Sequence, residues 1–142
     1  MEIVELQGLT DSQTGEIQDL MKQLTPDINV TAENLLETVE SPNTHFFVLV
    51  EDGLILGCAS LCVFESPTGR KASVEDVVVS LLYRGQGLGR KLMEHIIDYA
   101  KKELAPIDLH LTSNPKRVSA NALYKAVGFE KRETNVYRMV IK

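Results

Sequence analysis

The sequence predicts an α/β domain with a mixed sheet. Runs rich in β-branched residues alternate with segments whose apolar residues recur every three or four positions, which indicates strands interspersed with amphipathic helices. A glycine-rich turn also joins one apolar run directly to a helical segment, an order typical of α/β folds. At 142 residues, the chain is expected to form a single domain over residues 1–142.

The N-terminal part is predicted to contain one strand and two helices. Glu2–Leu6 has the length and composition of a short strand. A helix is expected to begin after an N-cap at Thr10 or Asp11 and to end near Leu24, just before a proline. A second helix is expected over Thr31–Val39, with its first residue as N-cap.

Three strands are predicted next. His45–Glu51 and Leu54–Phe64 are separated by Asp52-Gly53, a pair typical of tight hairpin turns. Arg70–Ser80 follows a turn that contains proline and glycine. An antiparallel hairpin therefore precedes the glycine-rich turn.

The remaining elements alternate between helix and strand. Gly87–Leu104 has the apolar spacing of an amphipathic helix, and Ile107–Thr112 has the alternation of a strand. A shorter helix is expected over Arg117–Val127, ending at Gly128. Asn135–Ile141 is predicted to close the sheet as its last strand.

Composition and charge exclude several classes of protein. The chain has 44% hydrophobic and 25% charged residues, as ordinary globular proteins do, and its net charge of −5 argues against a general nucleic-acid binder. No apolar stretch approaches the ~20 residues of a membrane span, and the N-terminus lacks the features of a signal peptide, so a cytoplasmic protein without membrane contact is expected.

The two cysteines are expected to be free. Cys58 and Cys62 fall on one strand, about 13 Å apart and too distant for a disulfide. No metal site is expected, because no cluster of His and Cys has ligand spacing.

The glycine-rich turn predicts a phosphate-binding site. It reads Arg84-Gly85-Gln86-Gly87-Leu88-Gly89, between a strand and a helix N-terminus, so exposed amides and the helix dipole would face one point. A nucleoside-triphosphate loop is excluded, because Arg90 and Lys91 stand where Lys and Ser or Thr are needed. A dinucleotide loop would need G-x-G-x-x-G at the start of a βαβ unit, whereas this turn reads G-x-G-x-G and follows a predicted antiparallel hairpin. A Rossmann-like nucleotide binder is therefore the weaker alternative.

The same loop matches Q/R-x-x-G-x-G/A, the pyrophosphate loop of the GNAT superfamily of acyl-CoA-dependent N-acyltransferases. The segment Ala120–Phe129 also resembles the A-x-x-L-Y-x-x-x-G-F signature of that family, and the order of the elements is similar. The resemblance covers essentially the whole chain. It implies a GNAT fold, with a mixed central sheet of about seven strands flanked by about four helices.

The resemblance implies acetyl-CoA as the acyl-donor cosubstrate and no metal. The pyrophosphate would bind the loop backbone, and the pantetheine would lie beside the preceding strand like an added strand. Where many members have Asn, this chain has Arg117, which is interpreted as a phosphate contact. The residues expected to bind the cofactor are Val77, Val78, Val79, Arg84, Gly85, Gln86, Gly87, Leu88, Gly89, Arg90, Asn114, Arg117, Asn121 and Tyr124.

Acetyl transfer to an amine needs a base for the ammonium and an acid for the departing thiolate. The resemblance assigns the acid to Tyr124. Glu75 is the candidate base, because alternation places it on one face with Val77 and Val79, and because its strand resembles that of amino-sugar N-acetyltransferases. A water relay or His110 is the alternative base.

The implied function is transfer of an acetyl group to a primary amine. The sequence leaves open a small amine, an amino sugar, an amino acid and a protein Lys or N-terminus, although the acidic chain favours a cationic acceptor. A catalytically silent acyl-CoA-binding regulatory module is the alternative. A homodimer formed through the C-terminal strand or an open sheet edge is compatible with the resemblance.

Overall fold

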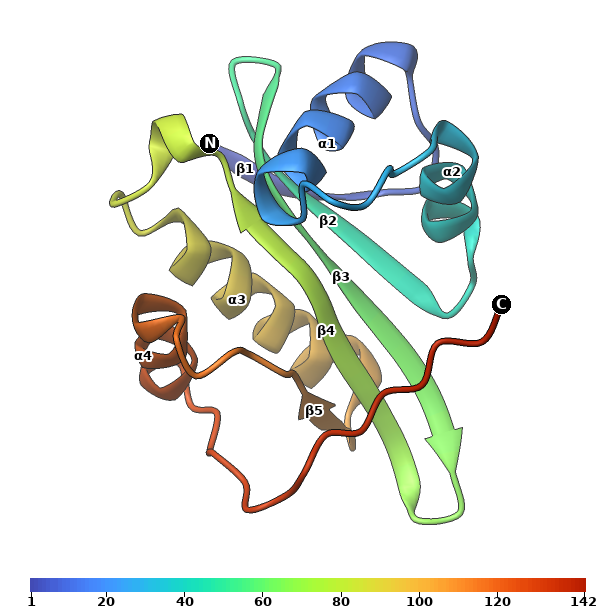
Figure 1. Ribbon diagram of the computed structural model, residues 1–142, viewed down its shortest axis with the longest axis vertical. Coiled ribbons are helices and arrows are strands. Elements are labelled where there is room, and N and C mark those ends of the chain that lie inside the picture. Colours follow the sequence, from blue (N-terminus) through green and yellow to red (C-terminus); the bar gives the residue numbers. More distant parts are fainter. The chain divides into compact units, whose positions relative to one another are not determined.

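A five-stranded mixed sheet organises the N-terminal part of the chain (Figure 1). The computed structural model describes residues 1–142, which divide into two units, Met1–Thr112 and Ser113–Lys142, and each is described by itself. The strands of the first unit are β1 (Glu2–Leu6), β2 (Thr44–Glu51), β3 (Leu54–Ser66), β4 (Gly69–Val79) and β5 (Asp108–His110). Neighbouring strands from β1 to β4 are antiparallel, whereas β5 runs parallel to β4.

Two helices follow β1 and begin where their N-caps predict. In α1 (Asp11–Leu24), Thr10 and Gln13 form a capping box, in which each side chain accepts a hydrogen bond from the backbone N–H of the other. In α2 (Ala32–Glu40), the side chain of Thr31 accepts from the backbone of Asn34. Both predicted helices are confirmed to within a residue at each end.

The sheet buries a different set of side chains on each face. Residues of α1 and α2, such as Ile17 and Leu35, pack in one core cluster with Phe46, Cys58 and Val78 of the strands. The opposite face carries α3 (Leu88–Tyr99), since Phe47 meets His95 and Tyr99 of that helix edge-on. The chain therefore forms three layers within residues 1–112.

The segment after β4 enters α3 through a short 3₁₀ turn, η1 (Leu81–Tyr83). The α-helical hydrogen bonding of α3 continues as a π-helical last turn, η2 (Ala100–Leu104), so the predicted helix to Leu104 is confirmed. Its buried residues have the expected spacing: Leu88, Leu92, Met93, Ile96 and Ala100.

The second unit contains one helix, α4 (Val118–Ala126), and no strand. The predicted strand Asn135–Ile141 is therefore wrong, and the sheet has five strands rather than about seven. Apolar residues of this segment, such as Tyr137 and Ile141, are exposed instead. A strand needs hydrogen bonds from a second strand, which the local alternation of side chains does not provide.

Candidate active site

The C-terminal half of β4 has one edge that no strand pairs with. The contact between β4 and β5 covers only Lys71, Ser73 and the residue between them (Figure 1). The next residue after the strand, Ser80, donates its N–H to Leu56 of β3 at 2.8 Å. Because backbone groups of successive strand residues point to opposite edges, those of Val79 and Val77 point away from β3. The first unit thus presents extended backbone at the position predicted for the pantetheine.

A β-bulge at Asp76 interrupts this strand. Cys58 of β3 lies opposite Val78, but Ser60, only two residues along, lies opposite Glu75, so β4 holds one extra residue. Asp76 takes a left-handed backbone with φ of 51°. The bulge therefore reverses the alternation of side chains across it.

The reversal overturns the predicted placement of Glu75. Cross-strand partners share a face, so Glu75 lies on the α1 and α2 face with Val78, whereas Val77 and Val79 lie on the other face. Alternation would hold only in a regular strand. Glu75 therefore lies across the sheet from the side chains with which it was grouped.

A polar cluster forms around Glu75 on the α1 and α2 face. The hydroxyl of Ser73 donates to Oε1 of Glu75 at 2.8 Å. His110 of β5 is the register partner of Ser73, so its side chain projects from the same face. The two alternative bases from the sequence thus share one face of adjacent strands, with Ser73 between them.

Asp76 adds a second carboxylate beside Glu75. Desolvation raises the pKa of Asp76, and the nearby charge of Glu75 raises it further. The same two carboxylates also act on Cys62 of β3, where burial is the main cause of a raised thiol pKa. The site is therefore locally acidic, in agreement with the net charge of the chain.

The N-terminus of α3 is left without a cap. Its N-cap residue Gly87 has φ of 75° and ψ of 17°, no side chain caps the helix, and no acidic residue lies in its first turn. Gly85 also has a positive φ, of 82°. A Cβ on either glycine would meet no atom within 4 Å, so the left-handed conformation, not crowding, requires glycine at both positions. The free amides and the helix dipole can receive an anion.

Three cationic side chains lie in or near this loop, and each has a different partner. Nε of Arg84 donates to the carbonyl of Val79 at 3.1 Å, so its guanidinium bridges the end of β4 and the loop. Arg90 pairs with Glu94 at 2.9 Å on the exposed face of α3. Lys91 contacts the sulfur of Met1 at 3.9 Å. Arg84 is thus the cation most closely tied to the predicted phosphate loop.

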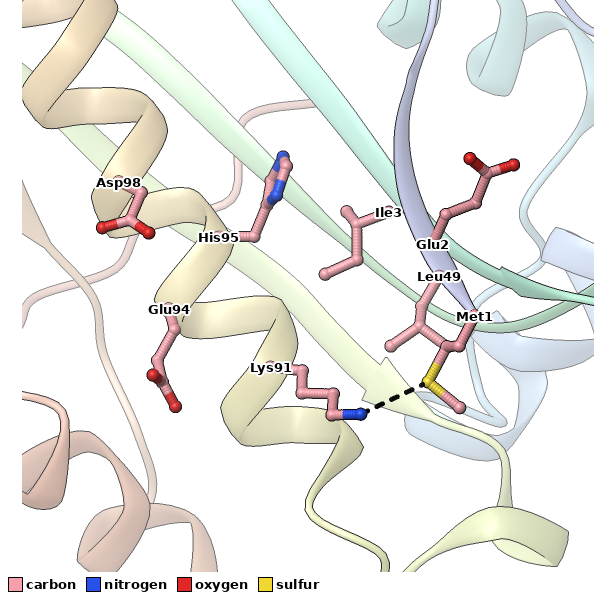
Figure 2. Close-up of a pocket in the computed structure, with 8 residues that line it drawn as sticks. All are labelled: Met1, Glu2, Ile3, Leu49, Lys91, Glu94, His95 and Asp98. Carbon is pink, nitrogen blue, oxygen red and sulfur yellow. Dashed lines mark hydrogen bonds between the residues drawn. The ribbon is translucent and has the colours of Figure 1, made fainter.

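A separate groove lies between β1 and α3 (Figure 2). Its volume is about 340 Å³, and Lys91 and His95 of α3 point toward Met1 and Ile3 across it, whereas the carboxylate of Asp98 points away. None of the predicted catalytic or cofactor-binding residues lines this groove. It is therefore distinct from the free edge of β4.

The second unit begins with a turn, and α4 follows it directly. The side-chain amide of Asn121 donates to the carbonyls of Asn114 and Arg117, at 3.0 Å and 2.8 Å. Oδ1 of Asn114 in turn accepts from the backbone of Lys116 at 2.9 Å. These two asparagines hold the start of α4, a structural task that the sequence did not assign to them.

Tyr124 is the buried residue of α4. Its ring packs edge-to-face on Phe129, with centroids 6.4 Å apart. Burial raises the pKa of the Tyr124 phenol, and the positive charge of Arg117 partly offsets this. The phenol therefore keeps its proton well above neutral pH, as a general acid requires.

Two features of the site were missed in the sequence. The bulge has a signal, because two consecutive acidic residues at 75 and 76 in an apolar strand cannot both avoid an apolar face under regular alternation. The hydrogen bond from Ser73 to Glu75 has a weaker signal in the sequence, because residues two apart in a strand lie on one face.

No group of His, Cys, Asp or Glu side chains in the structure could hold a metal ion, and no helix is both long and apolar enough to cross a bilayer.

Residues 11–129 match the model of the acetyltransferase (GNAT) family. The chain belongs to this family. Among curated GNAT relatives, streptothricin acetyltransferase of Streptomyces lavendulae is 30% identical over 112 residues, which is 78% of this chain and 57% of that protein. The chain spans little more than half the length of the first curated relatives it matches, 55% and 57%.

Solved structures share the GNAT fold of this chain. A putative acetyltransferase from Agrobacterium tumefaciens str. C58 has a TM-score of 0.84 at 21% identity, covering 99% of this chain and 100% of that one. The aminoglycoside N-acetyltransferase AAC(6')-Iy, solved in complex with CoA, has a TM-score of 0.76 at 17% identity over 98% of this chain and 93% of that one. Relatives of this chain thus include acetyltransferases and a fold neighbour that binds CoA.

Proposed function

We propose that this chain transfers the acetyl group of acetyl-CoA to a primary amine by direct attack on the thioester. The observation that carries the proposal is the free edge of β4, which leads into the uncapped N-terminus of α3. The free edge of β4 can pair with an extended arm that contains amides, and the uncapped N-terminus of α3 can bind a pyrophosphate. The family match covers residues 11–129 and so includes part of each unit, which supports one GNAT domain over residues 1–142.

The proposed donor site uses backbone more than side chains. Val77 and Val79 would pair with the pantetheine arm, while the amides from Gly85 to Gly89 hold the pyrophosphate and Arg84 adds positive charge. Leu88 is buried, so only its backbone is offered to the anion. Arg117 of the second unit is proposed as a further phosphate contact.

Acetyl-CoA supplies an activated acetyl thioester when bound. On the acceptor side, Glu75 takes a proton from the ammonium, directly or through one water, and frees the nitrogen lone pair for attack on the carbonyl carbon. Tyr124 gives its proton to the sulfur as the carbon–sulfur bond breaks. His110, on the same face as Ser73, is the alternative route for the first proton.

The proposed acceptor is an amine that carries positive charge before deprotonation. Glu75 and Asp76 project carboxylates from adjacent positions, and the whole chain carries a charge of −5. Such a field attracts a cation and disfavours an anionic acceptor. Streptothricin acetyltransferase and an aminoglycoside acetyltransferase are among the proteins similar to this one, which supports including aminoglycosides among the amines tested.

Titration calorimetry with acetyl-CoA, CoA and NAD⁺ tests the donor site first. Micromolar binding of acetyl-CoA that is lost in Gly87→Glu, where a carboxylate enters the phosphate site, would support the proposal. Preference for NAD⁺ would instead favour the hypothesis of a Rossmann-like nucleotide binder. A chain that binds neither acetyl-CoA nor CoA would overturn the assignment of acetyl-CoA as the donor.

Thiol release in the presence of an amine panel then tests turnover. An active enzyme releases CoA faster with one class of amine, and Glu75→Gln slows that release. The alternative is a catalytically silent acyl-CoA-binding module. It would bind acetyl-CoA normally, yet no amine would accelerate thiol release.

A further inference from the structure

A side chain from α1 reaches the segment that leads into the phosphate loop. Gln23 lies in the last turn of α1, and its Oε1 accepts a hydrogen bond from the backbone N–H of Leu81 at 2.9 Å. The two residues are 58 positions apart in the chain. This bond therefore links α1, which packs on the same face of the sheet as Glu75, to the start of the loop.

Two other hydrogen bonds hold the segment around Leu81, from Tyr83 N–H to the Ser80 carbonyl at 2.9 Å and from Arg84 Nε to the Val79 carbonyl at 3.1 Å, and both are local to the segment. The side chains of Leu81 and Leu82 are 60% and 85% exposed, so burial does not fix their position. Ser80 is held by Leu56 on β3, and Leu88 is buried at the start of α3. Between these two fixed points the conformation of the loop depends on individual hydrogen bonds.

We propose that Gln23 is a positioning residue that couples α1 to the phosphate loop. The inference rests on the proposed donor site. With the bond intact, the amides of the loop are held ready for the pyrophosphate, and binding there restrains the last turn of α1. Coupling of this kind is reciprocal, so an acceptor that orders α1 also tightens the binding of acetyl-CoA.

The test compares three variants of α1 with the unmodified chain. Gln23→Ala removes the acceptor oxygen, whereas Gln23→Glu keeps one. Gln18→Ala is the matched control, because Gln18 of the same helix also bonds to backbone through its side-chain amide. Its Nε2 donates to the carbonyl of Val30 at 3.0 Å, in the connection between α1 and α2. Acetyl-CoA affinity is measured by calorimetry, and thermal unfolding is followed in parallel.

Loss of one such bond is expected to weaken acetyl-CoA binding about fivefold in Gln23→Ala. Gln23→Glu and Gln18→Ala should bind acetyl-CoA within about twofold of the unmodified chain. Steady-state kinetics should show a raised KM for acetyl-CoA in Gln23→Ala with kcat unchanged at saturation, since the chemical groups are untouched.

Hydrogen exchange gives a readout that a structural role would not move. Acetyl-CoA should slow exchange in the last turn of α1 in the unmodified chain and in Gln18→Ala, but not in Gln23→Ala. Equal affinities for Gln23→Ala and Gln18→Ala, or equal protection of α1 in both, would overturn the coupling alone. An unmodified chain that binds no CoA species would overturn the proposed function, and the coupling with it.

Discussion

Ser73 donates a hydrogen bond to Glu75 on the face of the sheet that α1 and α2 cover, and the bulge at Asp76 separates both from the face of Val77 and Val79. The proposed base and the side chains beside the proposed donor arm thus occupy opposite faces of one strand. The free backbone edge between the two faces is the point where donor and acceptor would meet.

Replacement of Glu75 by Gln should reduce kcat about a hundredfold with the best amine, the lower range for loss of a general base. Acetyl-CoA affinity should stay within twofold, because the donor is held by backbone and loop. Asp76→Asn is the matched control and should have a much smaller effect on kcat. A Glu75→Gln enzyme of normal rate would leave His110 or water as the base, and His110→Gln would then be the variant to measure.

Replacement of Gly87 by Ala should destabilise the protein by about 1 kcal/mol, since an L-residue resists the left-handed backbone at this N-cap. Acetyl-CoA should bind more weakly as the loop changes shape, while Gly87→Asn should be better tolerated because Asn adopts this conformation more readily. Calorimetry and denaturant unfolding measure both effects.

Gly15→Ala provides the comparison for a glycine with no special backbone. Gly15 lies within α1, and a Cβ there meets nothing within 4 Å. This variant should gain about 0.5–1 kcal/mol of stability and bind acetyl-CoA normally. If both glycine variants behaved alike, the special role of Gly87 would be refuted.

Replacement of Tyr124 by Phe should slow thiol release at least tenfold if the phenol protonates the departing sulfur. The raised pKa of Tyr124 fixes the direction of the pH dependence. The acid works while it is protonated, so its contribution is present at neutral pH and is lost only as pH rises through a folded-state pKa that lies above the usual value for tyrosine. A fall in rate near neutral pH that vanished in Tyr124→Phe would contradict this assignment.

Both cysteine thiols should react slowly with thiol reagents at pH 8 in the folded protein. Burial is the main cause that raises the pKa of Cys58 to about 12, and it raises the pKa of Cys62 as well. The thiolate is the reactive form, so little of it is present. A colorimetric thiol reagent should therefore report CoA release with low background, and a burst of two thiols per chain without denaturant would contradict this.

The same shift predicts an alkaline loss of stability. Because the folded-state pKa of Cys58 is raised, its contribution is fully present below pH 9 and is lost as pH rises toward 12. Cys58→Ala should flatten this part of the curve of unfolding free energy against pH, at the cost of a small cavity. Denaturant unfolding between pH 8 and 11 measures the effect.

Local chemistry in the sequence determined most of the elements. Thr10 and Thr31 fix two helix starts, Asp52-Gly53 fixes a hairpin in which both residues have positive φ, and Gly87 fixes the turn into α3. Each of these depends on atoms within a few residues, so the sequence alone contains the reason. The left-handed turn at Gly85 and Gly87 was predictable for the same reason, while its binding of phosphate stays a prediction.

Only the tertiary structure decided three further points. The bulge at Asp76 changes the face of Glu75 because pairing with β3, not alternation within β4, sets the register. Asn135–Ile141 has the pattern of a strand, yet a strand exists only where another strand supplies hydrogen bonds. The bond from Gln23 to Leu81 joins residues 58 positions apart, which no local pattern specifies. The sequence by itself determines what is local, and contacts between distant segments determine which side chains share a site.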